Sequence, residues 1–408
     1  MSELTPEVAR RIIDTVGSNG IPPQYGLQFF TVGLDPYLTL IEDEYLSSFI
    51  KQGGSAFKMV VGSYGGGKTH FLYCVRDLAC KHNFVVSYVS LSPQESPFHK
   101  LELVYKAIVR GMVPSLSLQE FLSGYEQGIQ SFLRGWFSQR YQEYYSKGLS
   151  GDILREELLN EVEHMGGIES ISFMKAVKSA FRTLLDKQEK DFITICQWLS
   201  GESYDRHIHG NYGILQRIDK TTAFPMIRSL GQWIRQMGYS GLVVLLDEAE
   251  RTPSLSTKQR EQQLNNLREI IDECGHTTFQ GFMIFYAVPD ENFLEGRTQV
   301  YEALKQRVAT VFEVLNPTGV KIELEKGVSE PIPFLREIGS KLAKVYETAY
   351  LHKFEELAVE QTIQTIAEIS YEQRFGDTGY KRLFVEKLIR GFHFLRHKGL
   401  PPTPNDLR

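Results

Sequence analysis

The hydrophobic pattern of the chain alternates between short apolar runs and longer stretches with a helical period. Five runs have the length and composition of buried strands, at residues 56–61, 84–91, 241–246, 281–288 and 309–315. Near-continuous apolar strands that are joined by helical segments are typical of a parallel sheet with helices on both faces. The pattern therefore predicts an α/β fold with a parallel five-stranded sheet.

The segments around these runs predict the domain organisation. Residues 1–55 form an N-terminal helical prelude, with one helix that begins at Thr5-Pro6-Glu7 and is expected to stop at Gly17. The core follows at residues 56–316, and its stretch from about 97 to 235 has a helical period, so we predict a large helical insertion there. Residues 317–408 are helical again and are predicted to form a C-terminal helical lid.

Composition and charge limit the partners. The chain has 408 residues, of which 42% are hydrophobic and 23% charged, enough for about two or three globular domains. The formal net charge of −5 argues against non-specific coating of nucleic acid, although it does not exclude a local basic patch. Four scattered cysteines indicate reduced thiols. Because no signal peptide and no apolar run of roughly 18 residues is present, we expect a cytoplasmic protein without membrane contact.

The segment after the first predicted strand is a complete G-x-x-x-x-G-K-S/T phosphate loop. It consists of Gly62, Ser63, Tyr64, Gly65, Gly66, Gly67, Lys68 and Thr69. Its glycines let backbone N–H groups turn toward a β-phosphate, and the helix that follows adds the positive end of its dipole. Lys68 is expected to reach the β- and γ-phosphates, and Thr69 to ligate Mg²⁺. A glycine-rich turn that only resembles the motif is the alternative, but the strand-to-helix context favours nucleotide binding.

A second motif, at the end of the third predicted strand, separates classes of nucleotide enzyme. The apolar run 242–246 ends in Asp247 and Glu248, as in a Walker B motif. Asp247 is expected to hold Mg²⁺, and Glu248 to polarise the attacking water. Kinases of small molecules and GTPases generally lack the adjacent glutamate. The pair therefore favours an ATPase over the alternative, two acids that merely end a buried strand.

The order of these motifs resembles AAA+ type P-loop NTPases, and among them the BrxD-like ATP-binding proteins of BREX-type bacterial phage-defence systems, near the origin-recognition branch. The resemblance spans roughly residues 20–310 and rests on VVGSYGGGKTHFLYCVRD, VSLSPQESPFHKLELVYKAI, GLVVLLDEAER, NNLREIIDECG and YEALKQR. It implies a homo-oligomer with active sites between subunits, which hydrolyses ATP and regulates or remodels protein partners of a defence system.

The resemblance also implies roles for residues outside the two motifs. Arg307 occupies the position of an arginine finger that reaches the γ-phosphate of a neighbouring subunit, and an exposed helix arginine is the equal alternative. Arg382, which follows Gly379 at the start of a C-terminal helix, resembles a lid sensor that contacts nucleotide. His70 is included among the nucleotide-contacting residues, although packing under the sheet fits its ring better than catalysis.

Two features depart from the AAA+ pattern. The run 281–288 ends in Ala287-Val288, where AAA+ proteins place a polar sensor, and this puts fast hydrolysis in doubt. Asp290 or Asn292 could substitute, but each is equally a turn residue. The chain also ends about 90 residues after the sheet, which leaves room for a helical lid but little for a winged helix. Sequence-specific DNA binding is therefore not supported.

The sequence thus supports one principal function and two alternatives. The principal function is an Mg²⁺-dependent ATPase that converts hydrolysis into rearrangement of partner proteins or DNA complexes. The first alternative is a slowly hydrolysing, ATP-controlled switch or scaffold that docks partners on its helical insertion. The second is a DNA-associated translocase or loader, which requires a basic channel that the sequence does not locate.

Overall fold

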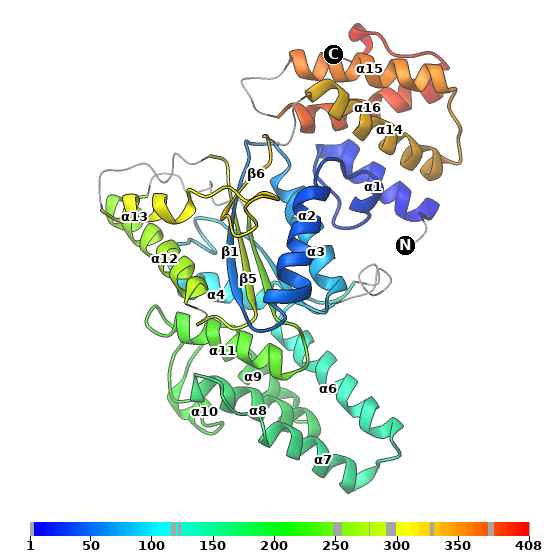
Figure 1. Ribbon diagram of the computed structural model, residues 1–408. Coiled ribbons are helices and arrows are strands. Elements are labelled where there is room, and N and C mark those ends of the chain that lie inside the picture. The colour runs from blue at the N-terminus through cyan, green and yellow to red at the C-terminus, as the bar shows by residue number, and fades with distance from the viewer. Residues whose placement is uncertain are drawn as a thin grey trace.

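A largely parallel sheet forms the centre of the molecule (Figure 1). The computed structural model describes residues 4–115, 120, 124–247, 255–276, 278–290, 299–326, 330–373 and 379–407. The strands are β1 (Ser55–Val61), β2 (Val85–Ser90), β3 (Met112–Val113), β4 (Leu242–Asp247), β5 (Phe282–Val288) and β6 (Lys321–Glu323). Their order is β3-β2-β4-β5-β1-β6, and each neighbouring pair except β2 and β3 is parallel. The predicted α/β class is therefore confirmed.

The sheet has six strands within the described ranges, so the predicted number of five was wrong. The additional strand, β3, lies at the edge and pairs antiparallel with β2, where Met112 is opposite Ser87. It follows α4 (Leu101–Arg110), inside the stretch that was predicted to be helical. A Cβ at Gly111 would lie 2.7 Å from the carbonyl oxygen of Tyr88, so this close return to β2 requires glycine. Two residues are too few to produce a periodic signal.

The last strand is displaced from its predicted position. Residues 309–315 contain isolated bridges instead of a strand, and the place beside β1 is taken by β6. The prediction was wrong because the apolar run does not stay inside the molecule: Phe312 is buried, whereas Val314 and Leu315 are 70% and 93% exposed. The chain turns after Leu315, and the strand beside β1 begins only at Lys321.

Alternate residues of each strand bury two separate faces of the sheet. On β4, Val243 and Leu245 join a core with α2 (Asp35–Ile41), the π-helix η2 (Glu42–Phe49) and α3 (Lys68–Lys81). Val244 and its alternate neighbours face α4, α11 (Ala223–Gln236), α12 (Thr257–Gly275) and α13 (Gln299–Val308). Figure 1 shows α2 and α3 on one side of the sheet, and α12 and α13 on the other. Both faces are covered, which explains the continuous apolar runs.

A group of helices connects β3 to β4 and extends below the sheet in Figure 1. It contains α6 (Ile129–Ser146), α7 (Gly151–Glu163), α8 (Ile171–Leu185), α9 (Glu189–Leu199), α10 (Arg206–Gly210) and α11. Aromatic rings fill its interior, where the ring of Trp136 lies 5.0 Å from that of Phe181 and 6.4 Å from that of Trp233. This interior is continuous with one face of the sheet. None of the described helices is long and apolar enough to cross a bilayer.

The C-terminal helices share a core with the first helix of the chain. α14 (Pro331–Tyr350), α15 (Glu356–Glu372) and α16 (Tyr380–Lys398) pack with α1 (Pro6–Asn19), as Figure 1 shows. The predicted stop of α1 was wrong: Gly20, with a φ of +59°, ends the helix instead of Gly17. Gly17 lies in the interface, where a Cβ would be 2.7 Å from the side chain of Ile389. Short 3₁₀ turns occupy Leu27–Phe29 (η1) and Pro404–Leu407 (η4).

Candidate functional site

The phosphate loop joins β1 to α3 at the carboxyl end of the parallel strands. β1 ends at Val61 and α3 begins at Lys68. Gly65 and Gly67 have φ values of +75° and +103°, which strain any residue with a Cβ. At Gly66, a Cβ would lie 2.9 Å from the carbonyl oxygen of Ser63. The three glycines are therefore required by the path of the loop. Gly67 is the N-cap of α3, so the free N–H groups of the first helical turn face the loop.

The side chain of Lys68 lies inside the loop. It is 7% exposed, and its Nζ donates to the carbonyl oxygens of Gly62 at 2.7 Å and Ser63 at 3.1 Å. These two acceptors are neutral, and hydrogen bonds between an ammonium group and a phosphate oxygen are stronger. The ammonium group of Lys68 can therefore exchange these two carbonyl oxygens for the oxygens of a bound phosphate.

The two residues predicted to hold Mg²⁺ are in contact. Thr69 lies in the first turn of α3 and Asp247 at the end of β4, and Thr69 Oγ1 donates to Asp247 Oδ2 at 2.6 Å. Asp247 is 1% exposed. Hydroxyl and carboxylate oxygens are the hard ligands that Mg²⁺ prefers, and this ion is commonly held by one or two protein oxygens together with phosphate and water. The pair fits such an ion.

Tyr88 is a second partner of Asp247, and the sequence analysis missed it. It lies on β2, the parallel neighbour of β4, and its hydroxyl donates to Asp247 Oδ2 at 2.8 Å. Burial, followed by the negative charge of Asp247, raises the pKa of Tyr88, so the phenol remains a hydrogen-bond donor at neutral pH. A tyrosine in an apolar strand gives no sequence signal for this role, because the contact depends on the neighbouring strand.

The start of α16 lies against the phosphate loop. Lys381 Nζ donates to the carbonyl oxygen of Gly66 at 3.1 Å. The backbone also approaches closely, since a Cβ on Gly65 would lie 3.0 Å from the Cα of Gly379. Burial lowers the pKa of Lys381, and the negative charge of Glu325 opposes that shift. A lysine that the sequence analysis did not select thus reaches the loop backbone, although it belongs to the same short motif as Arg382.

Arg382 itself contacts the outer side of the loop. Its Nη1 donates to the hydroxyl of Tyr64 at 2.9 Å, and its Nε donates to the carbonyl oxygen of Asn19 at 2.8 Å. Tyr64 is 62% exposed, and the guanidinium of Arg382 lies 5.7 Å from the centre of its ring. The predicted sensor arginine therefore connects the tip of the loop to the end of α1.

Glu325 is a further neighbour of the loop for which the sequence offered no signal. It follows β6, and its Oε1 accepts hydrogen bonds from the backbone N–H of Ser63, at 2.8 Å, and from the Ser63 hydroxyl. The same Oε1 is 3.1 Å from the position of a Cβ on Gly66. The end of β6 and the start of α16 thus both contact the loop.

His70 packs against the N-terminal segment of the chain. Its Nε2 is 2.8 Å from Thr31 Oγ1, and its ring lies edge-on to Phe30 at 5.3 Å. The backbone oxygen of Thr31 accepts from Lys341 of α14 at 2.7 Å. Burial, followed by the positive charge of Lys381, lowers the pKa of His70 to about 4. The imidazole is therefore neutral at physiological pH and links α3 to the segment that α14 also contacts.

Arg307 is paired within its own chain. On α13, its Nε and Nη2 donate to the two carboxylate oxygens of Asp272 at 2.6 and 3.0 Å, and its Nη1 donates to the carbonyl oxygen of Ala303 at 3.0 Å. The side chain is 34% exposed. Arg307 lies on the α12–α13 side of the sheet, and α3 lies on the other. The structure does not bring Arg307 to Lys68 and Thr69.

The remaining predicted residues follow β4 and β5 in the sequence. Glu248 and Asn292 lie outside the described residues. β5 is located between β1 and β4, and its last residues, Ala287 and Val288, are buried. Asp290 is exposed. The described part of this strand end is therefore apolar, as the sequence indicated.

Comparison with known proteins identifies the family. The family model described as BREX system ATP-binding protein BrxC/D matches residues 4–398, nearly the whole chain. No curated protein and no solved structure matches the chain. The matched span includes the phosphate loop, Asp247 and the start of α16. The chain belongs to the BREX system ATP-binding protein BrxC/D family and is thus an ATP-binding protein of a phage-defence system.

Proposed function

We propose that the protein is an Mg²⁺-dependent ATPase of the AAA+ type that regulates or remodels other components of its BREX system. The contact between Thr69 and Asp247 beside the buried Lys68 carries this proposal. The two partners are 178 positions apart in the sequence. A glycine-rich turn without a ligand has no need of a buried carboxylate at its edge, whereas a nucleotide site needs one for Mg²⁺.

Each residue of the site has a separate role in this proposal. Backbone N–H groups of residues 62–70 hold the phosphates, and Lys68 neutralises charge on the β- and γ-phosphates. Thr69 and Asp247 would hold Mg²⁺, which would supply positive charge beside the phosphates. Glu248, directly after Asp247, orients the attacking water and accepts its proton.

The start of α16 is proposed to respond to the nucleotide. Lys381 and Arg382 bind loop groups through single hydrogen bonds, to Gly66 and Tyr64. A triphosphate in the loop offers Lys381 a charged acceptor in place of a carbonyl oxygen, which favours a new position of the helix. The helices of the lid, α14 to α16, thereby transmit the state of the phosphate loop to α1, with which they share a core.

Arg307 is proposed to act across a subunit interface of a homo-oligomer. It would stabilise charge in the transition state of the neighbouring site. For this it must leave Asp272, with which it forms a partly exposed pair. Exposed pairs contribute about 0–1 kcal/mol, and a bidentate pair such as this one contributes more, so the phosphate charge of the neighbouring site has to offset the loss.

A slowly hydrolysing switch is the second candidate. It is favoured by the apolar end of β5 at Val288, and by the internal pairing of Arg307 with Asp272. In this version the protein binds ATP, holds the lid in one position, and docks partner proteins on the helical insertion at about 97–235. Both versions need the phosphate loop, and only the first needs Glu248.

The two versions are tested by Lys68→Ala and Glu248→Gln, with Lys220→Ala as an exposed-lysine control. ATP binding and Mg²⁺-dependent turnover are measured at several protein concentrations, with and without double-stranded DNA. We expect Lys68→Ala to lose both activities. We expect Glu248→Gln to bind ATP but to turn over at least about 100-fold more slowly, because it lacks the general base.

Each outcome selects between the versions. Turnover per subunit that rises with protein concentration supports a site completed by a second subunit and the role of Arg307. ATP binding without turnover in every condition, with phage defence retained in Glu248→Gln, favours the switch. Unchanged hydrolysis in Glu248→Gln excludes that residue as the base. Wild-type protein that does not bind ATP contradicts both versions.

A further inference from the structure

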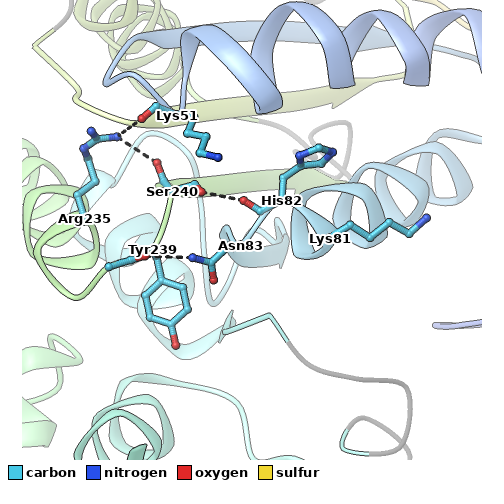
Figure 2. A pocket seen from close by; sticks show the side chains of 8 residues that line it. Lys51, Lys81, His82, Asn83, Arg235, Tyr239 and Ser240 are labelled. Atoms are coloured by element: carbon cyan, nitrogen blue, oxygen red, sulfur yellow. Dashed lines mark hydrogen bonds between the residues drawn. The ribbon is translucent and has the colours of Figure 1, made fainter. Parts of the chain in front are cut away.

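An open cavity of about 470 Å³ lies at the opposite end of α3 from the phosphate loop. Three segments meet there: the turn after η2, the end of α3, and the turn between α11 and β4 (Figure 2). The lining residues are Lys51, Lys81, His82, Asn83, Arg235, Gly238, Tyr239 and Ser240. The 14 residues of α3 rise by about 1.5 Å each, so this cavity is about 20 Å from the loop and separate from the nucleotide site.

The acceptors in the cavity wall are used by donors of the wall itself. Arg235 Nη1 donates to the backbone oxygens of Lys51 at 3.2 Å and Ser240 at 3.0 Å. Ser240 Oγ donates to the backbone oxygen of His82 at 2.8 Å, and Asn83 Nδ2 to that of Gly238 at 3.0 Å. These bonds, drawn in Figure 2, fix the three segments relative to one another. The wall therefore has few acceptors left for a cation or for a donor-rich ligand.

The charges on the wall have one sign. None of the eight lining residues carries a carboxylate, and four of them carry or can carry a positive charge. His82 is paired with Glu42 at 2.7 Å, outside the lining. Burial raises the pKa of Asp77, and the positive charges of Arg76 and, more weakly, of Lys81 oppose that shift. Within the described part of the chain, the ammonium groups of Lys51 and Lys81 have no hydrogen bond or ion pair.

We propose that this cavity binds a phosphate group through Lys51 and Lys81, with Arg235 adding positive charge to the same wall. The phosphate is presented either by a nucleic-acid backbone or by a small phosphate compound. Lysine binds phosphate as a point charge and needs no fixed geometry, which suits two exposed side chains on different segments. The volume accommodates a small ligand or one phosphate with its sugar. The acidic net charge of the whole chain does not oppose this, because charge acts locally.

The cavity gives the chain a local basic site that its net charge of −5 conceals. Because Lys51, Lys81 and Arg235 come from three distant segments, no basic run appears in the sequence. The proposal does not depend on ATP hydrolysis, and the cavity residues take no part in the nucleotide site described above.

The test is a double variant, Lys51→Gln with Lys81→Gln, which leaves Arg235 and the wall in place. Lys190→Gln with Lys220→Gln is the matched control, since both lysines are exposed and lie outside the cavity. A fluorescent 20-base-pair DNA duplex is titrated by anisotropy at several salt concentrations. Pyrophosphate is titrated by calorimetry in a Lys68→Ala background, which removes the phosphate loop as a competing site. Thermal unfolding and ATP binding of each double variant confirm that the fold is unchanged.

If the phosphate belongs to nucleic acid, the cavity variant binds the duplex at least tenfold more weakly at low salt. The slope of log K against log salt then falls by about 1.8, which is two phosphate contacts at about 0.9 each. If the phosphate belongs to a small compound, pyrophosphate binding is lost and duplex binding is unchanged. The proposal is overturned if the cavity variant binds both probes as the wild type does, if the control pair weakens binding equally, or if the wild type binds neither probe.

Discussion

The two ends of α3 both carry lysine side chains, but they differ in whether those side chains are hydrogen-bonded. At the loop end, Lys68 and Thr69 bind oxygens of the protein itself, and Lys381 binds the loop backbone. At the cavity end, Lys51 and Lys81 have no such bond to a described residue. A ligand at the loop must therefore replace existing contacts, whereas a ligand at the cavity only adds them. We infer that binding at the loop changes the conformation, and that binding at the cavity leaves it as it is.

The two ends of α3 also differ in burial. Lys68 and Asp247 are 7% and 1% exposed, whereas Lys51 and Lys81 are exposed to solvent. Charges interact more strongly when water is excluded, and exposed charges are screened by salt. Binding at the loop is therefore expected to tolerate salt and to select its ligand, and binding at the cavity is expected to weaken steeply with salt.

At the loop end of α3, the largest effect on ATP turnover is expected for Asp247→Asn. The amide keeps the shape of the side chain but removes the charge that we propose holds Mg²⁺, so we expect turnover to fall by about 100-fold or more. ATP turnover across an Mg²⁺ titration measures it. Tyr88→Phe is the graded control, because it removes one hydrogen bond to Asp247 and leaves the charge. Equal losses in the two variants would show that the carboxylate acts only through its local packing.

A smaller effect is expected of His70 on the stability of the protein at acidic pH. Its pKa of about 4 in the folded protein is below the ordinary value of 6.5, so the unfolded chain binds more protons between these pH values. The free energy of unfolding therefore falls as the pH falls through this window, by about 2 kcal/mol between pH 7 and pH 5. His70→Gln should lose this dependence. Urea unfolding at the two pH values measures it.

The control for the acid prediction is His207→Gln, an exposed histidine on α10. If both variants change the pH dependence equally, or if His70→Gln leaves it unchanged, the burial of His70 against Thr31 does not control acid stability. The loop end of α3 would then be no more sensitive to acid than the surface.

The smallest effect distinguishes two neighbours on α16. Lys381→Met removes a positive charge bonded to the loop backbone, so we expect the Kd for ATP to rise about tenfold, near the lower limit of about 1.5 kcal/mol for a hydrogen bond to a charged group. Arg382→Met removes a contact with the exposed Tyr64 and should raise the Kd less than about threefold. Calorimetric ATP titration compares them. If Arg382→Met raised the Kd for ATP more than Lys381→Met did, Arg382 and not Lys381 would be the residue that senses the nucleotide.

The sequence predicted the nucleotide site at one end of α3, but it did not predict the cavity at the other end. The phosphate loop and Asp247 were identifiable because each motif is a continuous run next to a strand, and the structure brings Thr69 and Asp247 together. Tyr88, Glu325 and Lys381 contribute through strand order and helix packing, which determine distance in space but leave no local pattern. The cavity depends on three turns meeting, so its lysines could not be recognised from spacing.

The errors in the fold have the same cause. β3 is too short for a period, and the run 309–315 is apolar although its last residues are exposed. Gly17 looked like a helix stop, because the sequence does not reveal that Ile389 packs against it. In each position a contact with a distant segment determined the outcome.

The shared core of α1 and the C-terminal helices has a consequence for synthesis of the protein. Five apolar side chains of α1 are buried there, yet about 300 residues separate Asn19 from Pro331 of α14. At about 5–20 residues per second, the ribosome leaves this apolar stripe without its partners for roughly 15 to 60 seconds. α1 thus emerges long before the helices that cover its apolar side. A chaperone that binds nascent chains would meet α1 well before α14 is synthesised.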